Sequence, residues 1–140
     1  MTPTRDLLTL LAGRSLPTFR LMEMQPARFD PEQRRLSVSA HIGPEFADGR
    51  GLLRGGFSAL LLDDVMTGAA ILTLGPETTP RLVSQTFNCL MDAGPGEFTA
   101  DGWVVTLGPT HCLAKAELRG PTGDLVVVAQ GILDQHPDEA

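Results

Sequence analysis

Two pairs of residues in the middle of the chain have types and spacing that could do chemistry: the glycines Gly55-Gly56 and the carboxylates Asp63-Asp64. The glycines begin an apolar segment that the sequence predicts to be a helix, so the first backbone N–H groups would be open to a ligand. Such groups, with the positive end of the helix dipole, stabilise an anion or a developing oxyanion. A nearby carboxylate can act as general base or nucleophile in the same reaction.

The carboxylates lie in an environment that makes their charge expensive. The segment from Phe57 to Leu72 is apolar on nearly every face, which predicts a helix wrapped by a sheet or by a partner. A buried ionised carboxylate must be paired, hydrogen-bonded or hydrated, so at least one of Asp63 and Asp64 should face a cavity or an interface. Asp64 points about 100° away around the helix. We expect Asp63 to be functional and Asp64 structural; the alternative for Asp63 is a hydrogen bond to Thr67, one turn on, or to backbone at a subunit interface.

The elements that must position these residues are marked by apolar segments and turns. A short helix is predicted from Thr4 to Ala12, and the central helix covers about residues 55–73. Gly-Pro turns separate the later segments, so the last four strands are predicted to form an antiparallel meander. The six predicted strands are Phe19 to Phe29, Arg35 to Ile42, Arg81 to Met91, Glu97 to Leu107, Thr110 to Leu118 and Leu125 to Leu133.

This order predicts a single α+β domain over residues 1–140, with one antiparallel sheet and the long helix packed on its face. The tail from Gln135 to Ala140 is predicted to be frayed. The central helix is too apolar to be covered by one side of one sheet, so we expect a dimer to cover the rest.

Composition narrows the function further. The chain has 140 residues, a formal net charge of −6 and a pI near 4.9, which argues against nucleic acid or an anionic membrane surface as its main partner. We expect neither a secretion signal nor an apolar run that crosses a bilayer, so a cytoplasmic protein is predicted. Its two cysteines and three histidines lack metal-ligand spacing, so we expect no metal and no cofactor.

The segment Arg54-Gly55-Gly56, followed by an apolar helix with Asp63, resembles the signature of the hotdog-fold acyl-CoA thioesterases of the phenylacetate-degradation type. In that family a His-Gly-Gly is followed by an Asp or Glu nine residues after the His. The resemblance implies a sheet wrapped around a central helix, a homodimer or a dimer of dimers, and hydrolysis of an acyl-CoA thioester. It also implies catalytic roles for Gly55, Gly56 and Asp63.

The chain departs from the family pattern at three positions that the resemblance assigns to the substrate site. Arg54 replaces the His, Asp48 replaces an Asn six residues ahead of it, and Leu82 stands where the following strand often carries a Ser or Thr. Arg54 and Asp48 would form an ion pair in place of a neutral contact. Ser84, two residues beyond Leu82, would lie on the same face of a regular strand and supply a hydroxyl.

A distance argument agrees with a shared site. Asp63 lies seven residues after Gly56, so the two are about 10 Å apart along one helix. One subunit cannot bring them together at one carbonyl. Two antiparallel helices related by a dyad would place Asp63 of one beside the glycines of the other, giving two equivalent sites in each dimer.

Three functions remain open from the sequence. The first is an acyl-CoA thioesterase that uses Asp63. The second is a catalytically impaired hotdog module that binds an acyl-CoA or a small acyl ligand without turnover, which the replacement of the His favours. The third is an assembly subunit without a small ligand. The two glycines also have an alternative explanation, because glycines equally serve tight packing of a helix on a sheet.

Overall fold

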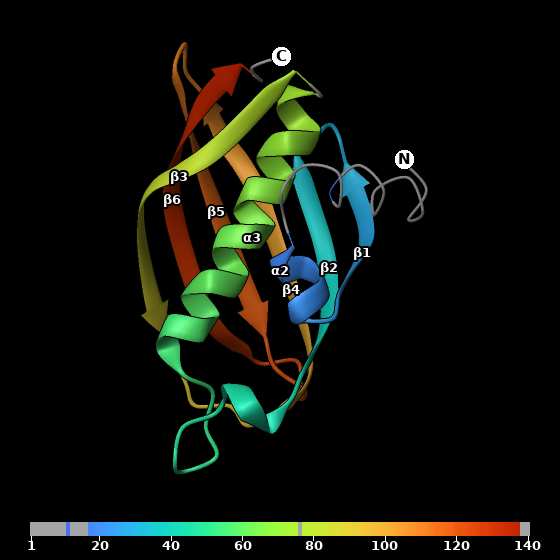
Figure 1. Cartoon of the computed structure of the whole chain (residues 1–140), viewed down its shortest axis with the longest axis vertical. Helices are drawn as coiled ribbons and strands as arrows, with labels where there is room; N and C mark the ends of the chain where they lie inside the picture. Colours follow the sequence, from blue (N-terminus) through green and yellow to red (C-terminus); the bar gives the residue numbers. More distant parts are fainter. Residues whose placement is uncertain (1–10, 12–16, 76, 138–140) are drawn as a thin grey trace.

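The computed structural model describes residue 11 and residues 17–75 and 77–137. Its centre is the helix α3 (Gly55–Leu74), which lies along one face of a six-stranded antiparallel sheet (Figure 1). The strand order is β1-β2-β4-β5-β6-β3, so β1 and β3 form the two edges. The strands are β1 (Met24–Asp30), β2 (Arg35–Ile42), β3 (Thr78–Cys89), β4 (Gly96–Leu107), β5 (His111–Arg119) and β6 (Leu125–Pro137).

The central helix begins and ends where the sequence predicts. Arg54 is extended (φ −75°, ψ 137°), and the helix starts at the glycine that follows it. It ends at Gly75, whose φ of 95° a residue with a side chain rarely adopts. The helix is long and apolar enough to cross a membrane, contrary to the sequence-based expectation. Its composition is explained by burial, because it is the core helix of the domain: Leu61, Leu62, Val65, Met66, Ala69 and Ala70 are fully buried.

The first predicted strand is partly wrong. Thr18–Leu21 form a short helix, α2, and the strand begins only at Met24. Pro17 holds the φ of −64° that a helix start needs, and the buried side chain of Phe19 packs in the core. The predicted helix from Thr4 to Ala12 lies outside the described residues, except for Leu11, which is helical and buried.

The predicted four-strand meander is also wrong in part. Only β4, β5 and β6 follow one another in the sheet, whereas β3 pairs with β6 and β4 pairs with β2. The chain leaves β2, crosses the sheet face as α3, and enters β3 at the far edge. It then returns to pair β4 with β2. The end of β6 was also underestimated, because β6 pairs with β3 as far as Pro137.

The close approach of α3 to the sheet depends on Gly102 in β4. A Cβ added at this residue would lie 2.7 Å from Val65 Cγ1 and 2.8 Å from the Val65 carbonyl oxygen. The second of these atoms belongs to the helix backbone and cannot move by a rotamer change. Gly102 therefore sets how deeply the helix settles on the sheet.

We predict that Gly102→Ala lowers the free energy of unfolding by about 1–3 kcal/mol, because the added methyl group pushes α3 away from β4. Gly49→Ala is the matched control, since a Cβ there meets nothing within 4 Å. Urea denaturation of the two variants checks this. Equal stability would show that the helix yields to the methyl group without cost.

Candidate functional site

The first turn of α3 is open to a ligand from outside the chain. Gly56 is exposed, and a Cβ added there would meet nothing within 4 Å. A Cβ at Gly55 would make ordinary contacts, 3.5 Å from Phe87 Cε2 and 3.6 Å from Cys89 Sγ. The packing explanation for the two glycines is therefore not supported at Gly56. The outer side of the first helical turn is therefore uncovered at Gly56, and the first N–H groups of a helix have no partner within the helix.

The loop before the helix is held by its own backbone and by two aromatic rings. Asp48 and Leu52 are joined by a backbone hydrogen bond of 2.7 Å, and the Arg54 N–H donates to the Phe46 carbonyl at 3.3 Å. The rings of Phe46 and Phe57 stack with centroids 4.1 Å apart. This stack ties the loop to the first turn of α3. The sequence analysis did not identify these two rings.

The predicted ion pair between Asp48 and Arg54 is replaced by another one. The Asp48 carboxylate accepts from the Arg50 and Leu52 N–H groups at 2.8 and 3.2 Å, and from the Arg50 guanidinium at 3.3 Å. These bonds, first the Arg50 N–H and then the Leu52 N–H, lower the pKa of Asp48. Asp48 thus closes a loop, as short acidic side chains do in turns. Arg54 keeps an exposed side chain that makes no capping bond to the helix.

Asp63 and Asp64 face different surroundings, as their angular separation on the helix predicts. Asp64 is buried, with 4% exposure, and accepts a hydrogen bond from the Thr18 hydroxyl of α2. Burial raises its pKa from 3.8 to about 6. Asp63 is half-buried and accepts from the Thr67 hydroxyl at 3.0 Å, which is the hydrogen bond given above as the alternative to a functional role. Burial raises its pKa as well, and the Thr67 bond partly offsets the rise.

A β-bulge in β3 decides which side chains face the helix. The register with β6 shifts between Leu82 and Ser84, so Leu82 pairs with the buried Leu133 and Ser84 with the exposed Ile132. Cross-strand partners share a face, so Leu82 faces α3 and Ser84 faces the opposite side. The prediction that these two residues share a face is wrong, because the extra residue of the bulge reverses the alternation.

The bulge brings a residue that the sequence analysis missed against the helix. Gln85 pairs with Gly131 and donates from Nε2 to the Ala59 carbonyl of α3 at 3.3 Å. Phe87 and Cys89 follow on the same face and lie beside Gly55. Figure 1 shows this end of β3 next to the start of α3. Gln85, Phe87 and Cys89 alternate along β3, so counting every second residue back from Cys89 identifies them. The sequence alone does not show that the strand ends at Cys89.

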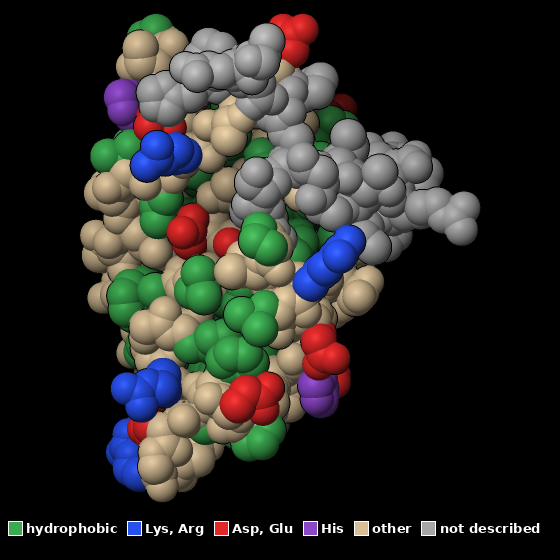
Figure 2. All heavy atoms as spheres, in the orientation of Figure 1, with side chains coloured by type: hydrophobic (Ala, Val, Ile, Leu, Met, Phe, Trp, Pro, Cys, Tyr) green, Lys and Arg blue, Asp and Glu red, His purple; other side chains and the backbone are tan. Residues whose placement is uncertain are grey.

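Apolar side chains remain exposed along the same edge of the domain. Figure 2 shows apolar side chains gathered over α3. Exposed apolar residues on α3, on β3 and just after β3 are Leu60, Val83, Phe87, Leu90 and Met91. β3 is an edge strand, so its outer side has no neighbouring strand among the described residues.

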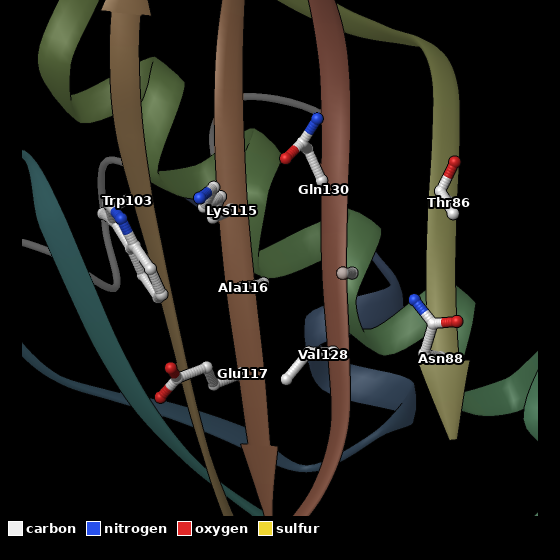
Figure 3. Close-up of a pocket in the computed structure, with 9 residues that line it drawn as sticks. Thr86, Asn88, Trp103, Lys115, Ala116, Glu117, Val128 and Gln130 are labelled. Atoms are coloured by element: carbon white, nitrogen blue, oxygen red, sulfur yellow. The ribbon is translucent and has the colours of Figure 1, made fainter. Parts of the chain in front are cut away.

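A hollow lies on the face of the sheet away from α3. This depression of about 500 Å³ is lined by polar and aromatic side chains that include Trp103, Lys115, Glu117 and Gln130 (Figure 3). Neither the helix glycines nor Asp63 line it. It is therefore separate from the site on α3.

Within one chain, the structure does not bring the predicted catalytic residues together. Gly56 and Asp63 belong to one continuous helix, two turns apart, which at 1.5 Å per residue separates them by about 10 Å. Among the residues the structure describes, no group of three or more His, Cys, Asp or Glu side chains is placed to hold a metal ion. What the helix offers is an open N-terminal turn and, farther along, a half-buried carboxylate.

No protein-family profile and no curated protein sequence matches the chain. Solved structures do. A thioesterase from Haemophilus influenzae is 18% identical, with a TM-score of 0.83 over 98% of this chain and 92% of that one. A mutant thioesterase from Pseudomonas aeruginosa is 24% identical, with a TM-score of 0.83 over 99% and 97%.

The PaaI protein from the phenylacetic acid degradation operon of E. coli is 13% identical, with a TM-score of 0.80 over 96% of both chains. These likenesses confirm the predicted fold: one antiparallel sheet with a long central helix, the hotdog arrangement. At such identities they concern the fold and leave the chemistry to the residues of this chain.

The surroundings of Asp64 can be tested through the dependence of protein stability on pH. Because the pKa of Asp64 is raised on folding, the folded state binds more protons than the unfolded state between pH 3.8 and about 6. The contribution of Asp64 to stability is therefore fully present below pH 3.8 and is lost as the pH rises through about 6.

We predict that Asp64→Asn is more stable than the natural chain at pH 8, on the order of 2 kcal/mol, because Asn accepts the Thr18 bond without a charge to bury. The advantage should shrink by about 1 kcal/mol at pH 5. Urea denaturation at both pH values measures it. If the difference in free energy of unfolding between the two proteins is the same at both pH values, the assigned surroundings of Asp64 are wrong.

Proposed function

We propose that the protein is an acyl-CoA thioesterase, which hydrolyses an acyl-CoA thioester to the free acid and coenzyme A. The observation that carries this proposal is the combination, on one helix, of an accessible first turn at Gly55-Gly56 and a half-buried carboxylate at Asp63. These are the two groups that thioester hydrolysis requires: donors for the oxyanion and a base for water. The names of the structural neighbours support the same chemistry.

We further propose that the site is completed by a homodimer. The exposed apolar residues along α3 and β3, with the unpaired edge of β3, favour this edge as the contact with a second copy. Around a dyad, antiparallel helices place Asp63 of one subunit beside Gly55-Gly56 of the other. In the dimer the two groups come from different helices, so the separation of about 10 Å within one helix no longer keeps them apart.

The reaction then follows from the groups present. The thioester oxygen accepts from the N–H groups at Gly55-Gly56 while Asp63 of the partner subunit takes a proton from water. Water adds to the carbonyl carbon, the C–S bond breaks, and the coenzyme A thiolate leaves and receives the proton. The raised pKa of Asp63 makes it a stronger base than an ordinary carboxylate.

The remaining predicted substrate-binding residues divide by position. Arg54, exposed at the helix start, is assigned to the mouth of the site, where its charge would meet an anionic part of the substrate. Leu82 is partly buried against the core on the side of α3 and is assigned a contact with the acyl group. Asp48 shapes the loop, and Ser84 faces away from the helix, so neither is assigned a contact with the substrate.

We predict that Asp63→Asn lowers kcat for acyl-CoA hydrolysis by about 10²- to 10⁴-fold, because the amide cannot accept the proton. Asp64→Asn, the neighbouring carboxylate that is buried against Thr18, is the matched control and should keep most of the activity. A free-thiol assay over a panel of acyl-CoA esters measures both variants. In the natural protein kcat/KM should rise with pH through an ionisation above the usual carboxyl range. Unchanged turnover in Asp63→Asn would remove this residue from the mechanism.

Subunit mixing tests the shared site separately. Gly56→Phe should block the first turn without disturbing the fold, because the space in front of Gly56 is open. Asp63→Asn and Gly56→Phe homodimers should both be inactive, whereas their mixture should recover about a quarter of the natural activity through mixed dimers with one intact site. If the mixture stays inactive while mixed dimers form, both residues act within one subunit.

A further inference from the structure

The side chain of Gln85 has a polar atom that nothing in the described structure explains. Its Nε2 donates to the Ala59 carbonyl at 3.3 Å, whereas its Oε1 is buried and has no hydrogen-bond partner. Exchanging the two atoms would set Oε1 against the Ala59 carbonyl oxygen, where neither could donate. The bond to the helix therefore fixes the amide and directs Oε1 away from Ala59.

An orphaned acceptor of this kind is costly. Leaving a buried carbonyl oxygen unbonded costs about 1–3 kcal/mol relative to a bonded one. Among the described residues, no other side chain with a buried unbonded N or O atom is found. Such an isolated case in the domain indicates a donor that is not part of this single chain, such as a water, a ligand or a second copy.

The position of this acceptor matches the site proposed above. Ala59 lies three residues beyond Gly56 and four residues before Asp63, which is about 4.5 and 6 Å along the helix axis. Gln85 therefore stands beside the helix between the first turn and the carboxylate. In antiparallel helices that set Gly56 against Asp63 of the partner subunit, it lies about one turn from both.

We propose that Gln85 Oε1 accepts a hydrogen bond from the water that attacks the thioester; this rests on the proposed thioesterase function. The water has two O–H groups and needs a lone pair directed at the carbonyl carbon. Asp63 of the partner subunit accepts one O–H and removes that proton. Gln85 accepts the other, gains no proton, and fixes the direction of the lone pair, which is the positioning that raises the rate.

The test replaces Gln85 by Met, which has nearly the same length and neither a donor nor an acceptor. Gln130→Met is the matched control, because Gln130 is the same residue type on the neighbouring strand, exposed on the face of the sheet away from α3 (Figure 3). Both variants and the natural protein are assayed on the acyl-CoA that the natural protein hydrolyses fastest. Size-exclusion mass and thermal midpoint establish that each variant is folded and assembled.

Hydroxylamine supplies a readout that a loss of structure would not move. It competes with water for the acyl group at the enzyme and yields a hydroxamate in place of the acid; its uncatalysed reaction with the thioester is measured without enzyme and subtracted. We expect Gln85→Met to lower kcat for hydrolysis by roughly 10- to 100-fold with KM nearly unchanged, and to raise the hydroxamate-to-acid ratio about fivefold or more. Gln130→Met should change neither.

Each other result overturns a definite statement. Equal loss of both products in Gln85→Met would make Gln85 structural and overturn the water assignment. A higher KM with unchanged kcat would mean that Oε1 binds an N–H group of the substrate, which also overturns it while leaving the thioesterase standing. If the natural protein hydrolyses no acyl-CoA in the panel, the proposed function fails and the water assignment fails with it.

Discussion

The structure depends on burying a helix that has no polar side. α3 carries apolar residues around most of its circumference, and the hydrophobic effect favours removing them all from water. One sheet can cover only one side of a helix. The sheet meets this demand by bringing α3 very close, which Gly102 permits by leaving the space that a side chain would fill. On the side next to β3 the sheet does not cover the helix completely, and apolar side chains stay exposed there.

The same constraint explains why the two neighbouring carboxylates behave differently. Adjacent helical residues point about 100° apart, so they cannot share one environment in a helix packed on one face. Asp64 turns toward α2, where the Thr18 hydroxyl compensates for burial. Asp63 turns to a less covered side, where Thr67 provides one bond and leaves the carboxylate with acceptor capacity. The more deeply buried acid is thus bonded to another element of the chain, and its neighbour keeps acceptor capacity on a less covered side of the helix.

Local signals in the sequence predicted the parts of the fold that local physics determines. The glycine pair that begins α3 marks the observed start of that helix, and the strand predicted from Arg35 to Ile42 has the bounds that the structure shows for β2. The strand order was not accessible, because pairing of β3 with β6 is a tertiary contact that Gly-Pro turns do not encode. The bulge in β3 was equally hidden, since its extra residue carries no distinctive sequence. Because the bulge shifts the register by one residue, the polar side chain beside the helix is that of Gln85 and not that of Ser84.

The replacement of a neutral ring by Arg54 changes charge at the helix start more than geometry. The loop there is closed by Asp48 through the Arg50 and Leu52 N–H groups, and it is joined to the helix by the stack of Phe46 on Phe57. None of these contacts involves the Arg54 side chain. A catalytic role for residue 54 in shaping the loop is therefore unnecessary in this chain. In the proposed thioesterase, the permanent charge of this exposed guanidinium at the positive end of a helix dipole would attract an anionic part of the substrate, and so act on binding ahead of the chemical step.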